Sequence, residues 1–178
     1  SIRFYLEHSK ITLLTETRFA NFLKKSQYFD HFLIDNRKGL WKTTNVILKV
    51  LSNKYDLIID LQNSKRSNFY NFFFKSLSKA KINGSKSNSH YRYVIPEQGV
   101  ESPGLGLFKQ LSMLNIPEIK TDYNWLHVDM DFNSIKNTIL FIPGVSKSGL
   151  QKQWNPDLFA QLAKYFEDKG FLICVVGT

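Results

Sequence analysis

Short apolar runs alternate along the chain with longer amphipathic stretches. The apolar runs have the length of β-strands, and the amphipathic stretches repeat their apolar residues with helical spacing. On this basis we expect strands at residues 11–14, 31–34, 56–61, 80–82, 138–142 and 171–176. We expect helices at residues 18–25, 40–51, 67–77, 105–114 and 156–168, and a loop at the polar stretch 83–89. Strands that alternate with helices in this way are typical of parallel α/β sheets with helices on both faces.

Some of these elements also carry a burial pattern. In the helix expected at 67–77, Phe69, Phe73 and Leu77 share a face that we expect to pack in the core rather than insert in lipid. The run 56–61 has the composition of a fully buried strand, and Cys174 lies in a similar run and is expected to be a small core residue. The helix expected at 40–51 carries its apolar residues on one face: Val46, Ile47, Val50 and Leu51.

Residues 115–137 differ from the rest because they are acidic, weakly periodic and interrupted by Pro117. We expect them to close one domain and to lead, through a linker near 128–137, into a second. The predicted domains are residues 1–130 and residues 131–178. A single strand–helix–strand unit is too small to bury its own core, and the chain does not begin with Met. We therefore expect it to be a piece of a longer protein.

The net charge of +9 is unevenly distributed. Residues 61–96 contain no acidic residue, and such a block favours phosphate-bearing partners or an anionic membrane surface. A solvated basic face would have the same composition. Lys75 and Lys79 lie one helical turn apart, in reach of anionic headgroups. The basic residues of this segment are Lys65, Arg66, Lys75, Lys79, Lys81, Lys86 and Arg92.

The composition also disfavours several kinds of site. No apolar run approaches the roughly 18 residues that span a bilayer, and the N-terminus lacks the apolar core of a signal peptide. A single cysteine excludes an internal disulfide and a cysteine metal site, and it fits a cytosolic location. The histidines show no ligand spacing, so we expect neither a metal ion nor a bound cofactor. They are His8, His31, His90 and His127.

The loop at residues 143–153 is the strongest candidate for a binding site. It contains serines, lysines and glycines but no acidic residue, and it leads into a helix with Asn155 as N-cap and Pro156 at the first helical position. A loop at the carboxyl end of a parallel strand and at the start of a helix is suited to binding an anion. We interpret it as a diphosphate pocket; the alternative is a polar surface loop before an ordinary helix cap. Its candidate ligands are Gly144, Ser146, Ser148 and Lys152.

Three stretches of the sequence share a resemblance. The first is PGVS at residues 143–146 followed by KQWNPDLFAQLA at 152–163, the second is YDLIIDLQNSKRS at 55–67, and the third is the opening segment 2–23. By their order along the chain and by their spacing, the three stretches resemble the ADP-heptose:lipopolysaccharide heptosyltransferases, glycosyltransferase family 9. Asn63 stands where the family usually has glycine.

The resemblance implies a GT-B architecture of two Rossmann-like domains. Residues 1–130 would form the acceptor-side domain without its first strand and loop, and residues 131–178 would begin the nucleotide-sugar domain. The implied reaction is inverting transfer of a sugar, heptose from ADP-heptose, to an anionic glycolipid acceptor of the lipopolysaccharide core type. The implied setting is the bacterial cytoplasm, with peripheral contact at the cytoplasmic face of the anionic inner membrane.

The resemblance also implies roles for single residues. Lys152 would meet the negative charge that grows on the leaving diphosphate, and Ser146 and Ser148 would donate hydrogen bonds to it. The catalytic Asp of the family would lie upstream of Ser1, and a further donor-binding segment would follow Thr178. The chain alone is therefore expected to be inactive.

On the acceptor side, the resemblance implies that Gln62, Lys65 and Arg66 bind the anionic substrate. A local ion pair is the alternative for Arg66. Asp60, at the end of its strand, is expected to be structural, and Trp154 to be a packing residue.

Two other functions remain open from the sequence. One is an α/β module that binds phosphate or nucleic acid through residues 61–96, which predicts salt-sensitive retention on DNA or RNA. The other is a non-catalytic fragment of a glycosyltransferase. The transferase hypothesis predicts binding of a nucleotide sugar and no retention on nucleic acid.

Overall fold

The computed structural model describes residues 2–36, 39–97, 100–119, 122–127 and 136–177, with side chains at all of these except positions 147 and 148. The chain divides into two compact units, unit 1 at Ser1–His127 and unit 2 at Val128–Thr178. Each unit is described by itself.

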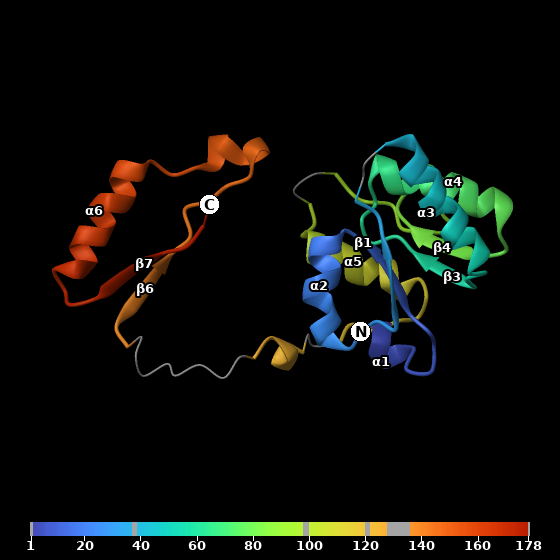
Figure 1. Ribbon diagram of the computed structural model, residues 1–178, viewed down its shortest axis with the longest axis horizontal. Helices are drawn as coiled ribbons and strands as arrows, with labels where there is room; N and C mark the ends of the chain where they lie inside the picture. The colour runs from blue at the N-terminus through green and yellow to red at the C-terminus, as the bar shows by residue number, and fades with distance from the viewer. Residues whose placement is uncertain (1, 37–38, 98–99, 120–121, 128–135, 178) are drawn as a thin grey trace. The chain divides into compact units, whose positions relative to one another are not determined.

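In unit 1, short strands alternate with helices (Figure 1). The first half contains α1 (Ile2–Tyr5), β1 (Thr12–Thr15), α2 (Thr17–Leu23), η1 (Lys24–Ser26), β2 (His31–Ile34) and α3 (Leu40–Ser52). The second half contains β3 (Leu57–Ile59), α4 (Lys65–Leu77), β4 (Lys81–Gly84), β5 (Tyr91–Arg92), α5 (Pro103–Ser112) and η2 (Asn124–Leu126). The expected alternation is confirmed, while α1, β5 and η2 were not predicted.

Each described strand pair is parallel. β1 pairs with β2 in the register Thr12↔His31, and β3 pairs with β4 and β4 with β5. These strands form two separate sheets, β1–β2 and β3–β4–β5. The parallel α/β class expected from the sequence is therefore what the structure has.

The core of unit 1 lies between the strands and the helix pair α3 and α4. Val46, Ile47 and Val50 of α3 are buried, as the sequence predicts. They cluster with Tyr70 and Phe74 of α4, and Leu14, Leu33 and Ile58 pack against the cluster from the strands.

The predicted buried face of α4 is wrong. Phe69 is 50% exposed and Leu77 is 66% exposed, and Phe73 is only partly buried. The buried positions are Tyr70, Asn71 and Phe74. The hydroxyl of Tyr70 and the amide of Asn71 have carboxylate partners inside the unit, which hold these polar residues inward and turn the neighbouring phenylalanines outward. The helix starts at Lys65 rather than 67, because Ser64 and Ser67 form a reciprocal capping box.

The predicted strand at 56–61 and the predicted loop at 83–89 also need correction. β3 has three residues, all half-buried, and it stops because the Asp60 carboxylate accepts bonds from the backbone N–H groups of Gln62 and Asn63, which turns the chain. The expected loop at 83–89 begins too early, because Asn83 and Gly84 belong to β4. Asn83 is fully buried in spite of its polarity, since its side-chain amide donates to the carbonyl of Gln110.

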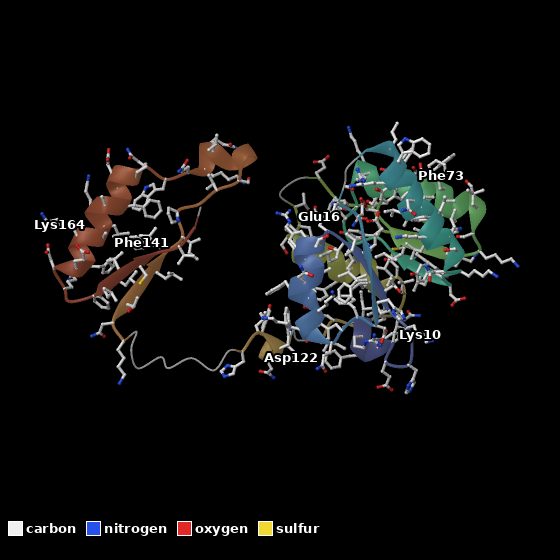
Figure 2. The ribbon with its side chains drawn as sticks, viewed as in Figure 1. Lys10, Glu16, Phe73, Asp122, Phe141 and Lys164 are labelled. Atoms are coloured by element: carbon white, nitrogen blue, oxygen red, sulfur yellow. The ribbon has the colours of Figure 1, made fainter. Side chains whose placement is uncertain are left out.

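Unit 2 contains β6 (Thr138–Phe141), η4 (Lys147–Lys152), α6 (Pro156–Glu167) and β7 (Leu172–Val175). β6 and β7 pair in parallel, and Phe141 points from β6 toward α6, where it contacts Phe159 (Figure 2). The strand expected at 171–176 is confirmed as β7, but its expected burial is wrong: Cys174 is half-buried and Leu172 is 59% exposed. Within the described residues α6 is the helix that packs on this two-stranded sheet, so side chains on its other face stay accessible.

Candidate functional site

Acidic residues follow three strands of unit 1 directly. Glu16 comes after β1, Asp35 after β2 and Asp60 after β3. Figure 2 labels Glu16 at the start of α2. All three line one cavity of about 390 Å³, together with Gln62. Ligands of open α/β sheets bind at the carboxyl ends of the strands, so this cavity is the candidate site of unit 1.

Asp35 holds Arg66 by one edge of its guanidinium group. The Arg66 Nη2 and Nε atoms donate to the Asp35 carboxylate at 3.0 and 3.3 Å, and the Tyr70 hydroxyl donates to it at 2.8 Å. The Thr43 hydroxyl accepts a longer bond of 3.4 Å from Arg66. The side chain of Asp35 is 9% exposed and that of Arg66 33%. The predicted acceptor residue Arg66 is therefore part of an ion pair within the chain, which is the alternative that the sequence left open.

The ionisation of this cluster follows from its burial and charges. The pKa of Tyr70 is raised, first by burial and then by the hydrogen bond to Asp35 and its negative charge. For Arg66, burial is the largest effect and acts to lower the pKa, but the hydrogen bond to Asp35 and the attraction of Tyr70 and Asp35 together raise it. Tyr70 thus stays protonated and donates to Asp35, and Arg66 stays charged.

Asp60 anchors a second, buried polar network. Its carboxylate accepts from the backbone of Gln62 and Asn63 at 3.1 and 2.9 Å, and from the amide of Asn71 at 3.0 Å. Gln110, which is fully buried, donates to the Asp60 carbonyl at 3.0 Å. These partners all belong to the fold, which agrees with the structural role expected for Asp60.

Asn63 extends this network toward the loop after β4. Its amide donates to Gln110 at 2.7 Å, and its side-chain oxygen accepts from the backbone N–H of Ser85 at 2.7 Å. Asn63 has a positive φ of 51°, a conformation that asparagine tolerates better than most residues. The network therefore fixes the turn that carries Gln62 and leads into Lys65.

The other predicted acceptor residues are exposed. Gln62 lines the cavity, whereas Lys65 is the first residue of α4 and is not among the lining residues. The sequence analysis missed Asp35 and Tyr70. Asp35 had a signal, because it ends an apolar run (FLID) in the same way that Asp60 does (LIID). Tyr70 had none, since it lies among phenylalanines of a helix.

The hydroxyl groups of Ser85 and Ser89 are buried without a hydrogen-bond partner in the described structure. They lie in and beside the turn that follows β4. A Cβ atom at Gly84 would meet the Ser89 hydroxyl at 2.8 Å, so the backbone of β4 and this turn approach closely only because residue 84 is glycine.

The predicted diphosphate loop lies at the carboxyl end of β6. Its middle forms η4, which was not predicted, and the loop is closed by the backbone bond from Gly149 to the carbonyl of Ser146 at 2.8 Å. Gly144 lies near the end of β7, since a Cβ at Gly177 would be 3.7 Å from the Gly144 nitrogen. The loop therefore sits at the edge where both strands end.

The start of α6 has the expected cap. The Asn155 side chain accepts from the Asp157 N–H at 2.9 Å, and Pro156 occupies the first helical position. Trp154 packs edge-on against Phe159, with ring centroids 4.7 Å apart, which agrees with its expected packing role. Lys152 is exposed at the end of η4. Ser146 is exposed as well, while the side chain of Ser148 lies outside the described part of the chain.

The described residues lack two further kinds of feature. No group of three or more His, Cys, Asp or Glu side chains within them is arranged to hold a metal ion. Nor does that part of the chain contain a helix with the length and hydropathy needed to cross a bilayer.

Similarity to known proteins identifies the family and the fold of the chain. A family model described as glycosyltransferase family 9 (heptosyltransferase) matches residues 44–178. The fold is similar to the crystal structure of the glycosyl transferase family 9 from Veillonella parvula DSM 2008, with a TM-score of 0.68 and 17% identity. That match covers 99% of this chain and 56% of the other, so the chain spans about half of that protein. It confirms the expected fold, a parallel α/β fold of the GT-B type. No curated protein matched the sequence.

Proposed function

Because the chain belongs to glycosyltransferase family 9, we propose that it takes part in moving a sugar from a nucleotide diphosphate sugar to an acceptor hydroxyl with inversion. The donor we propose is ADP-heptose, and the acceptor an anionic glycolipid of the lipopolysaccharide core type. Residues 131–178 would bind the nucleotide sugar and residues 1–130 the acceptor. The single observation that carries this proposal is the loop from Gly144 to Asn155, which lies where β6 ends and α6 begins.

The chemistry of the donor explains this loop. When an acceptor hydroxyl attacks the anomeric carbon, the bond to the diphosphate breaks and negative charge grows on the leaving phosphate oxygen. The start of α6 offers the positive end of a helix dipole, while the N–H groups of Asp157, Leu158 and Phe159 are bonded to Asn155. Lys152 adds a full charge, and Gly144, Ser146 and Ser148 add backbone or hydroxyl donors. No metal ion is needed for this role in the proposal.

The donor site is tested by calorimetric titration of the chain with ADP-heptose. Lys152→Ala should weaken binding by roughly 10- to 100-fold, since a hydrogen bond to a charged group is worth about 1.5–3 kcal/mol. Lys164→Ala is the matched control, because Lys164 lies in the last turn of the same helix (Figure 2). Equal affinity of the two variants would remove Lys152 from the site. If the parent chain does not bind ADP-heptose, the proposal that ADP-heptose is the donor is contradicted.

On the acceptor side, we propose that Gln62, Lys65 and Arg66 contact the anionic substrate. Asp35 occupies the Nε and Nη2 edge of Arg66, which fixes the direction of the remaining edge. The network of Asp60 fixes the turn that presents Gln62. The test is binding of a phosphorylated core oligosaccharide, which Lys65→Ala should weaken and Lys54→Ala should not.

The general base is proposed to come from a segment that precedes Ser1, as the family resemblance implies. Asp35 and Asp60 already accept hydrogen bonds from the chain, which leaves them poorly suited to remove a proton. We therefore propose that this chain alone binds substrates without turning them over. Measurable turnover by the chain from Ser1 to Thr178 would refute this part.

We also propose a peripheral position on the cytoplasmic face of the inner membrane. Phe69 and Phe72 of α4 are 50% and 54% exposed, beside the exposed Lys75 and Lys79, a combination suited to an anionic surface. The parent chain should co-float with vesicles that contain phosphatidylglycerol. A variant with both Lys75→Glu and Lys79→Glu should no longer co-float with them. Lys164→Glu is the control, and equal flotation of all three would refute the position.

Nucleic acid is not a partner in this proposal. Two arginines of the basic segment point to the chain's own groups: Arg66 pairs with Asp35, and Arg92 donates to the carbonyl of Ser85. The chain should therefore pass through a column of immobilised DNA or RNA at moderate salt. Salt-sensitive retention would instead favour the nucleic-acid-binding function.

A further inference from the structure

Two large apolar side chains lie almost fully exposed at the start of α3. Leu40 is 84% exposed and Trp41 is 89% exposed, the two highest values among the large apolar residues that the structure describes. The turn before them is made by Gly39, whose φ of 76° is costly for other residues. Burial of side chains of this size is strongly favourable, so unit 1 by itself leaves most of this hydrophobic surface uncovered.

The exposed apolar surface continues along the outer side of α3. Leu48 follows Trp41 by two helical turns, so both side chains lie on the same face of the helix, and Leu48 is 59% exposed. Val46 and Val50, on the opposite face, are buried in the core. α3 therefore carries apolar residues on two faces, and the core of unit 1 uses only one of them.

The neighbouring helix α4 extends this surface. α3 and α4 share the core cluster and lie side by side (Figure 1). The bond from Arg66 to the Thr43 hydroxyl places the starts of both helices at the same end. On α4, two aromatic side chains are half-exposed on the side away from the core. The residues of what we call the outer face are Leu40, Trp41, Leu48, Phe69 and Phe72.

The part of the chain that forms the outer face is strongly basic. Residues 36–96, which include both helices, contain 12 of the 24 lysines and arginines but only two of the 15 aspartates and glutamates. One of these two acids, Asp60, is buried. On α3, Lys42 and Lys49 are exposed two helical turns apart, each next in sequence to Trp41 or Leu48. The outer face therefore combines apolar side chains with positive charge, and an anionic lipid surface complements both.

We propose that Leu40 and Trp41 insert into the interfacial layer of an anionic bilayer and anchor unit 1 there, with the outer face against the lipid headgroups. This inference rests on the peripheral membrane position proposed above, and it identifies the residues that enter the membrane. Tryptophan suits this layer because its ring is apolar while its indole N–H can bond to headgroups. The adjacent lysines would pair with lipid phosphates, and their aliphatic stems would lie along the apolar side chains.

The anchor lies at the end of the helix pair that carries the proposed acceptor residues. α3 and α4 begin shortly after the carboxyl ends of β2 and β3. Arg66 is bonded to Thr43, two residues after Trp41 in the same helix. Insertion of Trp41 would therefore hold this edge of unit 1 at the bilayer surface. A glycolipid acceptor would then reach the site by diffusion in the plane of the membrane.

Flotation with vesicles of phosphatidylglycerol and phosphatidylcholine tests the anchor. Trp41→Ser and Leu40→Ser should each weaken partitioning by roughly tenfold or more, because each removes an apolar side chain that the bilayer would bury. Tyr123→Ser is the matched control, since Tyr123 is an aromatic residue of unit 1 that is 66% exposed and lies outside both helices. This control should partition like the parent chain.

A second measurement keeps an aromatic ring at position 41, so it does not depend on the stability of the serine variants. Phospholipids with brominated acyl chains quench a tryptophan that enters the bilayer. The parent chain should lose part of its tryptophan emission on binding to such vesicles, whereas Trp41→Phe should still bind and should lose this quenching. The other two tryptophans, Trp125 and Trp154, lie outside α3 and α4 and provide the reference emission.

The outcomes separate the anchor from the proposals on which it rests. If the parent chain does not bind anionic vesicles, the peripheral position is refuted and the anchor with it. If the parent chain binds but Trp41→Ser binds equally well, or if brominated lipids quench Trp41→Phe as strongly as the parent, the position stands and the anchor is refuted. Self-association in the absence of lipid that Trp41→Ser abolishes would assign the outer face to a second copy instead. No nucleotide sugar is present, so none of these results bears on the donor.

Discussion

The ion pair between Asp35 and Arg66 makes a measurable prediction about what Arg66 does. Asp35→Asn keeps the shape of the side chain and removes its charge. The change weakens the two bonds of 3.0 and 3.3 Å from Arg66 and leaves a guanidinium group without its counter-charge. Breaking a fully buried pair costs roughly 3–5 kcal/mol. Because the Arg66 side chain is 33% exposed, water compensates in part, and we expect a loss of about 2 kcal/mol.

The assay is urea unfolding of unit 1, followed through the NMR amide signals of α3 and α4. A double-mutant cycle with Arg66→Gln isolates the pair from other effects of each change. We expect a coupling energy of about 1–2 kcal/mol. Arg18→Gln is the control, since Arg18 belongs to a pair with Glu16 in which its own side chain is 72% exposed. It should cost less than about 0.5 kcal/mol.

The result that would refute the reasoning is a coupling energy below about 0.5 kcal/mol. Arg66 would then not depend on Asp35 for its position, and the functional role expected from the sequence would be the better explanation of its presence. A large coupling energy assigns Arg66 first to the architecture of the site and only through its other edge to an acceptor.

Three more predictions concern the networks around the sites. Gln110→Ala should destabilise unit 1 by about 3 kcal/mol in urea unfolding, because the Asp60 carbonyl, the Asn63 amide and the Asn83 side-chain oxygen each lose their bond to the Gln110 side chain; a loss under about 1 kcal/mol would contradict this. Asn155→Ala should cost unit 2 about 1 kcal/mol, and Asn155→Asp should restore it if the cap is the cause. The pKa of His90 is lowered from its ordinary 6.5, first by burial and then by Lys81 and Lys75. The stability that neutral His90 contributes is therefore present above pH 6.5, and it is lost as the pH falls from 6.5 through the lower pKa of the folded state. A midpoint above 6.5 in an NMR titration of His90 would contradict this lowered pKa.

The order of elements could be predicted from the sequence because it depends on local periodicity. The strand 31–34 and the helix from Leu40 were placed with bounds close to those observed, and the Asn155 cap was predicted from its neighbours alone. What failed depends on partners far away in the chain. The phase of α4 is set by Asp35, 35 residues before Tyr70. The burial of Asn83 is set by Gln110, 27 residues later.

The candidate sites show the same division. A polar loop before a capped helix is a local pattern, so the residues from Gly144 to Asn155 could be proposed from sequence. The pairing of Arg66 could not, because nothing near it in the sequence marks Asp35 as its partner. The extent of burial was also overestimated for β3 and for the strand around Cys174. Apolar runs show what a strand can bury, but burial itself requires a neighbour on each face.

The first turn of α4 has a consequence for how unit 1 holds together. This turn contains Lys65 and Arg66 and no acidic residue. Two cations therefore lie at the positive end of the helix macrodipole, where each is unfavourable by several tenths of a kcal/mol or more. The negative charge that a helix start usually takes from its own first turn comes instead from Asp35, the residue that follows β2. Fraying of this turn and displacement of the end of β2 should therefore occur as a single cooperative event.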